Sequence, residues 1–297
     1  MILVAGATGV LGSEIVRQLR ADGRPVRALV RKTSSPERIA ELERSGVEIV
    51  RGDLKDRASL DAALDGVDTV ISTVTTILTS QPGDSFDATD GAGTRNLIDA
   101  AADAGVNRFV YISFDTSQVP DSPLTVAKRD VESHLRRSGL TYTVLQPGLF
   151  MESWLGPYLF ADPVAGTAKV YGAGTQGVRY VAVRDVAAMA VRCLAVTSAR
   201  NATIPFGGPE PISQREAVRL FEKETGKSFT VTEIPADALE AQRSATTDPF
   251  EKTFAALMLG VARGLGADVN APPPEFEMSR MTRPQEFVQR AAGSAPR

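Results

Sequence analysis

The first half of the chain alternates short apolar runs with longer amphipathic stretches. Each apolar run is rich in Val, Ile, Leu or Tyr and is bounded by turn or polar residues, as buried strands usually are. Leu11, Ile15 and Leu19 recur at helical spacing between the first two runs. This pattern predicts an α/β fold, a doubly wound parallel Rossmann sheet covered by helices on both faces. The expected strands are Ile2–Ala5, Val26–Val30, Glu48–Arg51, Thr69–Ser72, Arg108–Ser113 and Tyr142–Gln146.

The order of these strands along the chain predicts how they lie in the sheet. Crossovers between parallel strands are right-handed, so we expect the order 3-2-1-4-5-6 with a ligand crevice at the carboxyl ends of strands one and four. The alternation weakens after about Phe150. We therefore expect a dinucleotide-binding Rossmann domain over residues 1–150 and a smaller substrate-binding region over 151–297, with 178–200 packing back on the first domain.

The second region contains fewer clear elements. Val178–Val183 is typical of a strand, and Asp185–Ala195 of a helix capped by Asp185. Ser213–Thr225 is a further expected helix, in which Glu216 completes a capping box with Ser213. Pro284–Ala292 is expected as a final short helix.

Composition excludes several classes of protein. Hydrophobic residues make up 43% and charged residues 23% of the 297, and the net charge is −3 with mixed signs. Without a basic stripe, nucleic acid is not an expected partner. No apolar run reaches the roughly 20 residues of a membrane span, so we expect no membrane partner either. Cys193 is the single cysteine, which excludes an intrachain disulfide and a cysteine metal cluster and suits a soluble protein in the reducing cytoplasm.

The strongest chemical signal is a glycine-rich loop between the first strand and the first helix. Its sequence is Gly6-Ala7-Thr8-Gly9-Val10-Leu11-Gly12. Glycine permits the tight turn and lets backbone N–H groups approach a pyrophosphate, whose charge is also stabilised by the helix amino terminus. The alternative is a turn with a structural role only. Because the loop follows a strand and opens an amphipathic helix, we expect it to bind a dinucleotide.

The residues after strands two and three indicate which dinucleotide. An NAD enzyme usually has Asp or Glu after strand two to bind the ribose 2′-hydroxyl, whereas this chain has Arg31-Lys32. Cations there favour the 2′-phosphate of NADP(H), the alternative being a solvated basic turn. After strand three, Asp53 is expected near the adenine amino group and Leu54 against the ring. A turn or capping aspartate explains Asp53 equally well.

These motifs together resemble the NmrA-like, atypical short-chain dehydrogenase/reductase family, over most of the chain. The resemblance implies that Thr73 and Val74 pass close to the cofactor, that Lys128 holds the nicotinamide ribose, and that Pro147-Gly148 line the nicotinamide. Ser113 stands at the position that resembles the family's serine, so Ser113 and Lys128 are the candidate catalytic residues. The matching segments are Gly6–Gly12, Arg31, Gly52-Asp53, Gly93–Leu97, Val106–Ser113, Lys128, Gln146–Gly148 and Arg184–Ala187.

One departure from the family pattern leaves the function open between two classes. Standard members have Tyr four residues before the Lys, where this chain has Leu124, which cannot donate a proton. The first reading is an NADPH-dependent oxidoreductase whose acceptor, such as a quinone or enone, needs no tyrosine; Tyr158 is a substitute donor by position, or a packed aromatic. The second is a non-catalytic NADP(H)-sensing regulator or assembly factor. A hydrolase or metalloenzyme is poorly supported, because His134 is the single histidine.

The substrate is expected to be a small apolar or aromatic molecule. Phe150–Tyr158 is expected to form part of the pocket wall, and the second region also contains Phe160 and Phe206. Core packing explains these aromatic residues equally well. The sequence identifies neither the substrate nor the oligomeric state, and it leaves an oligomer open.

Overall fold

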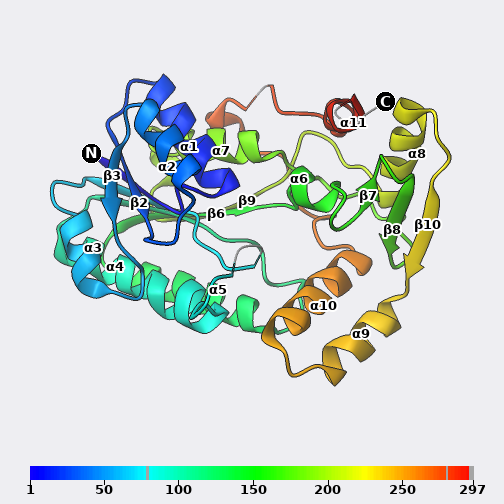
Figure 1. The fold of residues 1–297 in the computed structure, drawn as a ribbon, viewed down its shortest axis with the longest axis horizontal. Coiled ribbons are helices and arrows are strands. Elements are labelled where there is room, and N and C mark those ends of the chain that lie inside the picture. Colours follow the sequence, from blue (N-terminus) through cyan, green and yellow to red (C-terminus); the bar gives the residue numbers. More distant parts are fainter. Residues whose placement is uncertain (78–79, 279, 294–297) are drawn as a thin grey trace. The chain divides into compact units, whose positions relative to one another are not determined.

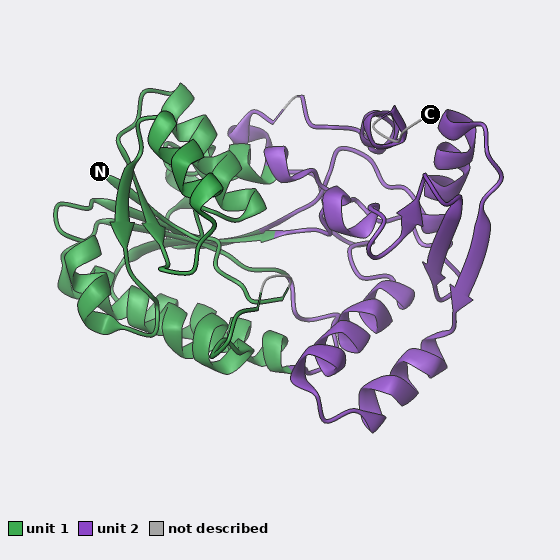
Figure 2. Ribbon diagram, viewed as in Figure 1, with its two compact units in different colours: residues 1–114, 123–146, 186–204 green, residues 115–122, 147–185, 205–297 purple. Residues whose placement is uncertain are grey.

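The computed structural model of the protein describes residues 1–77, 80–278 and 280–293. The chain forms two compact units that interleave along the sequence (Figure 2). Unit 1 consists of Met1–Phe114, Pro123–Gln146 and Val186–Ile204, and unit 2 consists of Asp115–Ser122, Pro147–Asp185 and Pro205–Arg297.

A seven-stranded sheet forms the centre of the fold. Its strand order is β3-β2-β1-β4-β5-β6-β9, and the paired strands from β1 to β6 run parallel, which confirms the doubly wound Rossmann-like fold and the predicted order of six strands. The seventh strand, β9, was not predicted. The bounds are β1 Ile2–Ala5, β2 Val26–Val30, β3 Glu48–Arg51, β4 Thr69–Ser72, β5 Arg108–Ile112, β6 Thr141–Pro147 and β9 Ala202–Phe206.

Helices cover both faces of this sheet (Figure 1). One face carries α1 (Val10–Ala21), α2 (Pro36–Arg44) and α7 (Val183–Arg192), and the other carries α3 (Arg57–Ala63), α4 (Thr94–Asp103) and α5 (Pro123–Arg137). Apolar side chains from α3, α4 and α5 meet those of β1, β4 and β5 in one core cluster. Strands β1, β4 and β5 are buried at every position, as their largely apolar sequences predict.

The segment before α4 has an unusual helical geometry. Residues Phe86–Gly93 form a π-helix, η1, which continues directly into α4. π-Helical turns are rare and are frequently found at functional sites.

Unit 2 is built from short strands and five helices among the described residues. Its sheet has the order β10-β8-β7. A second core cluster contains Phe160, Phe221 and Phe229, whose rings contact one another. The bounds are β7 Ala161–Asp162, β8 Thr167–Tyr171, β10 Thr230–Ile234, α6 Met151–Trp154, α8 Gln214–Thr225, α9 Ala236–Ala245, α10 Pro249–Ala262 and α11 Pro284–Gly293, with a short 3-10 turn, η3 Pro274–Phe276. A second 3-10 turn, η2 Thr197–Ala199, belongs to unit 1.

Two expectations for the second half of the chain are wrong. Val178–Val183 is not a strand, because Val178 and Val181 make only isolated bridges, to Ile212 and to Phe150. These valines are apolar because they are buried in a core, at 1% and 0% exposed. The apolar run therefore indicated a buried segment, but this segment does not pair along its length with a strand.

Asp185 does not cap the helix that was expected to begin there. The helix starts two residues earlier, at Val183, so Asp185 lies in its first turn. Its carboxylate accepts a hydrogen bond from the Thr282 N–H at 2.7 Å. Burial raises the pKa of Asp185, although the bond from Thr282 opposes this. Asp185 therefore anchors the segment before α11.

The capping box of α8 is confirmed. The Ser213 hydroxyl accepts from the Glu216 N–H at 3.2 Å, and the Glu216 carboxylate accepts from the Ser213 N–H at 2.9 Å. Gly226 ends the helix in the left-handed conformation with φ of 68°. The last helix, α11, also matches its prediction to within one residue.

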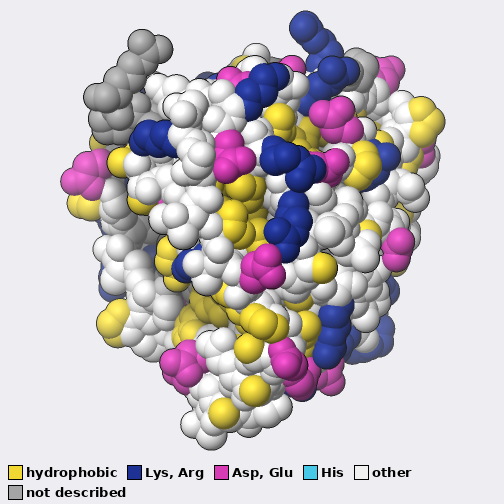
Figure 3. All heavy atoms as spheres, turned by 90° about the vertical axis from the view of Figure 1, so that its right-hand side faces the viewer, with side chains coloured by type: hydrophobic (Ala, Val, Ile, Leu, Met, Phe, Trp, Pro, Cys, Tyr) yellow, Lys and Arg dark blue, Asp and Glu magenta, His cyan; other side chains and the backbone are white. Residues whose placement is uncertain are grey.

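The surface charge is mixed, as the sequence indicates. On the face in Figure 3, Lys and Arg side chains lie beside Asp and Glu side chains and between hydrophobic ones. Within the ranges that the structure describes, no helix is both long and apolar enough to span a membrane. The same ranges contain no group of three or more His, Cys, Asp or Glu residues arranged to hold a metal ion.

Candidate dinucleotide-binding site

The glycine-rich loop connects β1 to α1 and has three glycines with different roles. Gly6 has a φ of 83°, and a Cβ there would lie 2.5 Å from Thr73 Oγ1. A Cβ on Gly12 would lie 2.1 Å from the Gly6 carbonyl oxygen, so only glycine lets the helix approach the strand this closely. A Cβ on Gly9 would meet only that same oxygen, at 3.2 Å, so the space around it is otherwise open. The first and third glycines are thus required by packing, and the second is not.

The start of α1 is suited to an anion. Gly9 is the N-cap and supplies no side-chain hydrogen bond, and the first turn contains no acidic residue. The first N–H groups of a helix have no acceptor within the helix, and they carry the positive end of its dipole. An open glycine beside these N–H groups is a fit for a diphosphate.

Thr73 fixes the loop against the end of β4. Its N–H and Oγ1 both donate to the Ala5 carbonyl, at 3.0 and 3.2 Å. Val74 follows and packs partly buried against the unit 1 core. Both residues lie where the strand order reverses between β1 and β4, which is where open α/β sheets bind ligands.

Arg31 lies directly after β2, but it is not a free cation. Its Nη1 donates to Asp84 Oδ2 at 2.7 Å, and its N–H donates to Ser34 Oγ at 3.0 Å. The Arg31 side chain is 30% exposed. Lys55, which follows β3, donates to the other Asp84 oxygen at 2.6 Å. The contacts of Arg31 and Lys55 with Asp84 were not predicted from the sequence, because Asp84 lies in a turn-rich segment far along the chain.

Two further predicted residues have structural partners. Asp53 Oδ1 accepts from the Lys55 N–H at 2.9 Å, which is the hydrogen bond of an Asx turn. The alternative of a turn aspartate thus describes the contacts of Asp53. Leu54 is 5% exposed and belongs to the unit 1 core, where a Cβ on Gly93 would lie 2.9 Å from it. Burial there leaves little of Leu54 free to contact an adenine ring.

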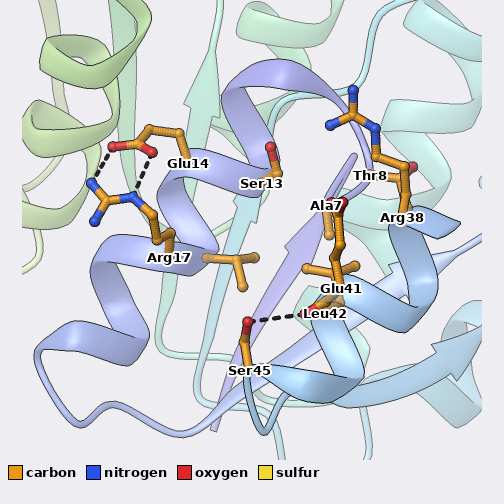
Figure 4. Close-up of a pocket in the computed structure, with 10 residues that line it drawn as sticks. Ala7, Thr8, Ser13, Glu14, Arg17, Arg38, Glu41, Leu42 and Ser45 are labelled. Atoms are coloured by element: carbon orange, nitrogen blue, oxygen red, sulfur yellow. Dashed lines mark hydrogen bonds and ion pairs between the residues drawn. The ribbon is translucent and has the colours of Figure 1, made fainter.

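A hollow of about 240 Å³ adjoins the glycine-rich loop, between α1 and α2 (Figure 4). Thr8 and Arg38 lie on one side of it, with Glu14 and Arg17 across from them. The Arg38 side chain makes no hydrogen bond or ion pair with the described residues, whereas Arg17 is paired with Glu14 at 2.6 Å. Arg38 is therefore a third basic residue after β2, beyond Arg31 and Lys32. Arg38 could have been identified in the sequence from its position in the first turn of α2, the helix that follows β2.

Lys128 projects from α5 into a buried polar cluster. Its Nζ donates to the Ile112 carbonyl at 3.3 Å and lies 4.8 Å from the centre of the Tyr111 ring. Burial lowers the pKa of Lys128, while the negative charges of Asp90 and Glu132 act in the opposite direction. The ammonium is thus held in place by a carbonyl and a ring face, without a direct carboxylate partner among the described residues.

Several buried polar atoms around Lys128 lack a partner among the described residues. They include Ser113 Oγ, the Tyr111 hydroxyl and Asp90 Oδ1. The other Asp90 oxygen accepts from the N–H and Oγ1 of Thr76, at 3.1 and 2.8 Å. Burial raises the pKa of Tyr111, so its phenol stays protonated. Unsatisfied buried groups are uncommon in folded proteins, and they suit a region that a polar ligand completes.

Leu124 is buried one turn before Lys128, at 3% exposed. The side chain thus packs into the core at the position where the resemblance to the family implies a tyrosine. Sequence reasoning found Lys128, Ser113 and Leu124 but missed Asp90 and Thr76, which come from η1 and the loop after β4. No local motif distinguishes those two residues from ordinary polar positions.

Pro147, Gly148 and Tyr158 belong to unit 2. The Gly148 N–H donates to the Phe206 carbonyl at 2.8 Å, and a Cβ on Gly148 would lie 3.0 Å from the Arg179 carbonyl oxygen. Tyr158 is 69% exposed, and its ring makes an edge contact with Phe254. Tyr158 is thus a surface aromatic in unit 2.

His134 has a partner outside any catalytic arrangement. Its Nε2 lies 2.6 Å from Asp99 Oδ1, and this pair joins α5 to α4. Among the described residues, no serine hydroxyl forms a hydrogen bond with the ring. The arrangement is therefore an interhelical link.

Fold and site together define a Rossmann-like α/β protein with a glycine-rich loop and a basic group after the second strand. The model of the NmrA-like family matches residues 1–257, and the chain belongs to this family. Over 247 residues it is 33% identical to the photosystem II assembly factor Ycf39 of Synechocystis sp., covering 82% of this chain and 74% of that protein. It is also 33% identical over 250 residues to the NAD(P)H azoreductase of Xenophilus azovorans, covering 83% and 80%.

A solved structure shares the fold over nearly the whole chain. The triphenylmethane reductase of Citrobacter sp., determined in complex with NADP(H), aligns with a TM-score of 0.78 at 23% identity. The alignment covers 98% of this chain and 100% of that chain. The likeness establishes a common architecture.

Proposed function

We propose that this protein is an NADP(H)-dependent oxidoreductase that reduces a small apolar acceptor. The observation that carries this proposal is the open glycine-rich loop at the start of α1, with Arg31 at the end of the next strand. Membership of the NmrA-like family and the likeness to an NAD(P)H azoreductase support it. NADPH, when bound, would supply the hydride.

The residues of unit 1 have distinct roles in this proposal. The N–H groups of Gly6–Gly12 bind the diphosphate, and Arg31 with Lys32 binds the 2′-phosphate. Lys128 binds the nicotinamide ribose through its ammonium. Ser113, whose hydroxyl has no partner among the described residues, is the second candidate catalytic residue. Thr73 and Val74 line the path of the cofactor. Positioning of the two reactants would supply most of the rate enhancement.

The nature of the acceptor follows from Leu124. A simple ketone needs a proton donor for the alkoxide that forms, and leucine at this position cannot be one. A conjugated acceptor such as a quinone, an enone or an azo compound spreads the added charge and accepts its proton from water. We therefore expect turnover of conjugated acceptors and none of simple ketones.

The single buried cysteine suits a reducing compartment such as the cytoplasm.

Cofactor binding is the first test of the proposal. We expect NADPH to bind at least about tenfold more tightly than NADH, with Arg31→Gln removing most of this difference because it loses the charge that meets the extra phosphate. The measurement is a fluorescence titration of both cofactors, with Arg57→Gln as the control, since Arg57 forms a surface ion pair with Asp61. Equal losses for both cofactors in Arg31→Gln would contradict the assignment.

NADPH oxidation in the presence of quinones, enones, azo dyes and triphenylmethane dyes is the second test. Turnover of one of these acceptors supports the oxidoreductase. Binding of NADPH without turnover of any of them contradicts it.

A second candidate function is a non-catalytic NADP(H)-sensing regulator or assembly factor. Leu124 in place of the usual tyrosine favours it, as does the likeness to an assembly factor. This candidate predicts a protein partner whose affinity changes between NADP⁺ and NADPH. Turnover of an acceptor in the panel would contradict it.

A further inference from the structure

Asp84 is a fully buried carboxylate in the loop between β4 and η1. Its side chain is 0% exposed, although Gly83 and most of its neighbours in the loop are not buried. Oδ2 accepts from Arg31 Nη1 at 2.7 Å and from the Gln81 N–H at 3.2 Å. Oδ1 accepts from Lys55 Nζ at 2.6 Å and from Thr89 Oγ1 at 3.1 Å. One side chain therefore joins the segments that follow β2, β3 and β4 to the start of η1.

The four donors require a carboxylate at this position. Each oxygen accepts two hydrogen bonds, one of them from a cation. An asparagine would have to turn its NH₂ group toward one of these pairs, so that donors would face donors. Burial by itself would raise the pKa of Asp84, but the hydrogen bonds from Lys55 and Arg31 outweigh it and lower the pKa to about 2. The side chain is thus charged throughout the physiological range.

Asp84 leaves part of the Arg31 guanidinium available. Only Nη1 is engaged by Asp84, and the guanidinium makes no other hydrogen bond or ion pair with the described residues. The planar fork of an arginine presents five N–H donors, and two of them together match a phosphate. A guanidinium held through one nitrogen therefore keeps donors in a fixed direction for an anion.

The charges of this cluster balance before Lys32 is counted. Arg31 and Lys55 contribute two positive charges, and Asp84 and Asp53 contribute two negative charges, with Asp53 Oδ2 lying 3.8 Å from Lys55 Nζ. Lys32, adjacent to Arg31 in the sequence, makes the net charge positive. Both cations lie within hydrogen-bonding distance of the carboxylate oxygens and screen them from a more distant phosphate. Orientation of Arg31 then outweighs the repulsion between Asp84 and the phosphate, because nothing else among the described residues fixes the guanidinium.

We propose that Asp84 is a positioning residue that sets the preference for NADP(H), by holding Arg31 and Lys55 ready for the 2′-phosphate. The inference rests on the proposed function, in which Arg31 binds that phosphate. Asp84 itself does not touch the cofactor in this assignment.

Binding of two adenosine fragments tests this role without any need for activity. The full chain is titrated calorimetrically with 2′,5′-ADP, which carries the 2′-phosphate, and with 5′-AMP, which lacks it. Asp84→Asn is expected to weaken 2′,5′-ADP binding by about tenfold or more and 5′-AMP binding by less than about threefold. Asp61→Asn is the matched control, because Asp61 pairs with Arg57 on the surface at 55% exposed; it should change neither affinity.

A second variant keeps the test informative where Asp84→Asn fails to fold. Thr89→Val removes one hydrogen bond to Oδ1 and leaves every charge in place. It is expected to cause a smaller loss that is again selective for 2′,5′-ADP, with a melting temperature that shows the variant to be folded.

The outcomes separate this inference from the function on which it rests. A wild-type chain that binds 2′,5′-ADP no better than 5′-AMP overturns the NADP(H) preference and the role of Asp84 with it. If the wild type prefers 2′,5′-ADP, equal losses for both fragments in Asp84→Asn, or tighter binding of 2′,5′-ADP, overturn only the role of Asp84.

Discussion

At the scale of single residues, the chemistry of a position could be predicted from the sequence better than its partners. Arg31 was predicted from its place after the second strand and Lys128 from the family resemblance, and their roles toward a cofactor stay predictions. Asp84 was not found, because it lies 53 residues beyond Arg31 in a turn-rich segment. Hydrogen bonds between loops depend on which strand ends lie next to one another in the sheet. A local sequence pattern does not contain that information.

Cys193 is a buried thiol whose reactivity follows from its burial. The side chain is 0% exposed, and burial raises the pKa of its thiol to about 12. The thiolate is the form that reacts with disulfide reagents, so the folded protein should react very slowly at pH 8. The measurement is release of thionitrobenzoate from Ellman's reagent with and without denaturant. Rapid reaction of the native chain would contradict the burial of this thiol.

Asp84 should also give the protein a characteristic acid sensitivity. Its folded-state pKa of about 2 lies below the ordinary value of 3.8, so its contribution to stability is fully present above about pH 4 and is lost as the pH falls toward 2. Asp84→Asn is expected to lower the melting temperature at pH 7 and to make little difference near pH 2. Melting curves across this range provide the check, with Asp61→Asn as the control; a difference from wild type that is equal at every pH would rule out this linkage.

At the scale of elements, apolar runs predicted the first six strands well and the later ones poorly. Strands β1, β4 and β5 are buried at every position, and each of the early runs has a neighbouring strand. Val178–Val183 is equally apolar but has only isolated bridges, so the sequence marked burial and not pairing. β9 was not predicted, because its run contains Pro205 and proline is unfavourable in the interior of a sheet. Proline is tolerated at the edge of a sheet, which is where β9 lies.

The three glycines of the β1–α1 loop can be separated by experiment. In Gly12→Ala the new Cβ would meet the Gly6 carbonyl oxygen at 2.1 Å, so we expect a large loss of stability together with loss of NADPH binding. Gly9 has a φ of −78°, and a Cβ there would meet only the Gly6 carbonyl oxygen, at 3.2 Å, so Gly9→Ala should keep the melting temperature within a few degrees.

Binding should nevertheless fall in Gly9→Ala, since the added methyl group occupies space beside the helix N–H groups. Thermal unfolding and NADPH titration of both variants measure the two effects. Full NADPH affinity in Gly9→Ala would show that the loop has only a structural role.

At the scale of the whole molecule, the order of the parallel strands could be predicted because crossover handedness leaves few choices. The division into compact units could be read only in part. We expected residues 178–200 to pack back on the first domain, and unit 1 includes Val186–Ile204. Unit 2 also takes Asp115–Ser122, from before residue 150, which no sequence pattern indicated. Contacts between distant stretches hold these pieces, such as the bond from Arg108 Nη2 to the Cys193 carbonyl at 3.1 Å.

A fragment ending at residue 150 is therefore expected not to fold as the full chain does. It would lack α7 and β9, and with them the Ala199 carbonyl that accepts from Thr143 Oγ1 at 2.6 Å. The exposed edge of β6 would be open to pairing with other chains. Size-exclusion chromatography and near-ultraviolet circular dichroism of residues 1–150 and 1–297 test this. A monodisperse fragment with native-like tertiary signals would contradict it.

The position of β9 at the outer edge of the sheet has a consequence for synthesis. Strands β1 to β6 leave the ribosome in order, yet their sheet gains its last strand only after Phe206 has been translated. A nascent chain that pauses between residues 147 and 202 would expose the unpaired edge of β6. We therefore expect a chaperone to bind the chain during this interval.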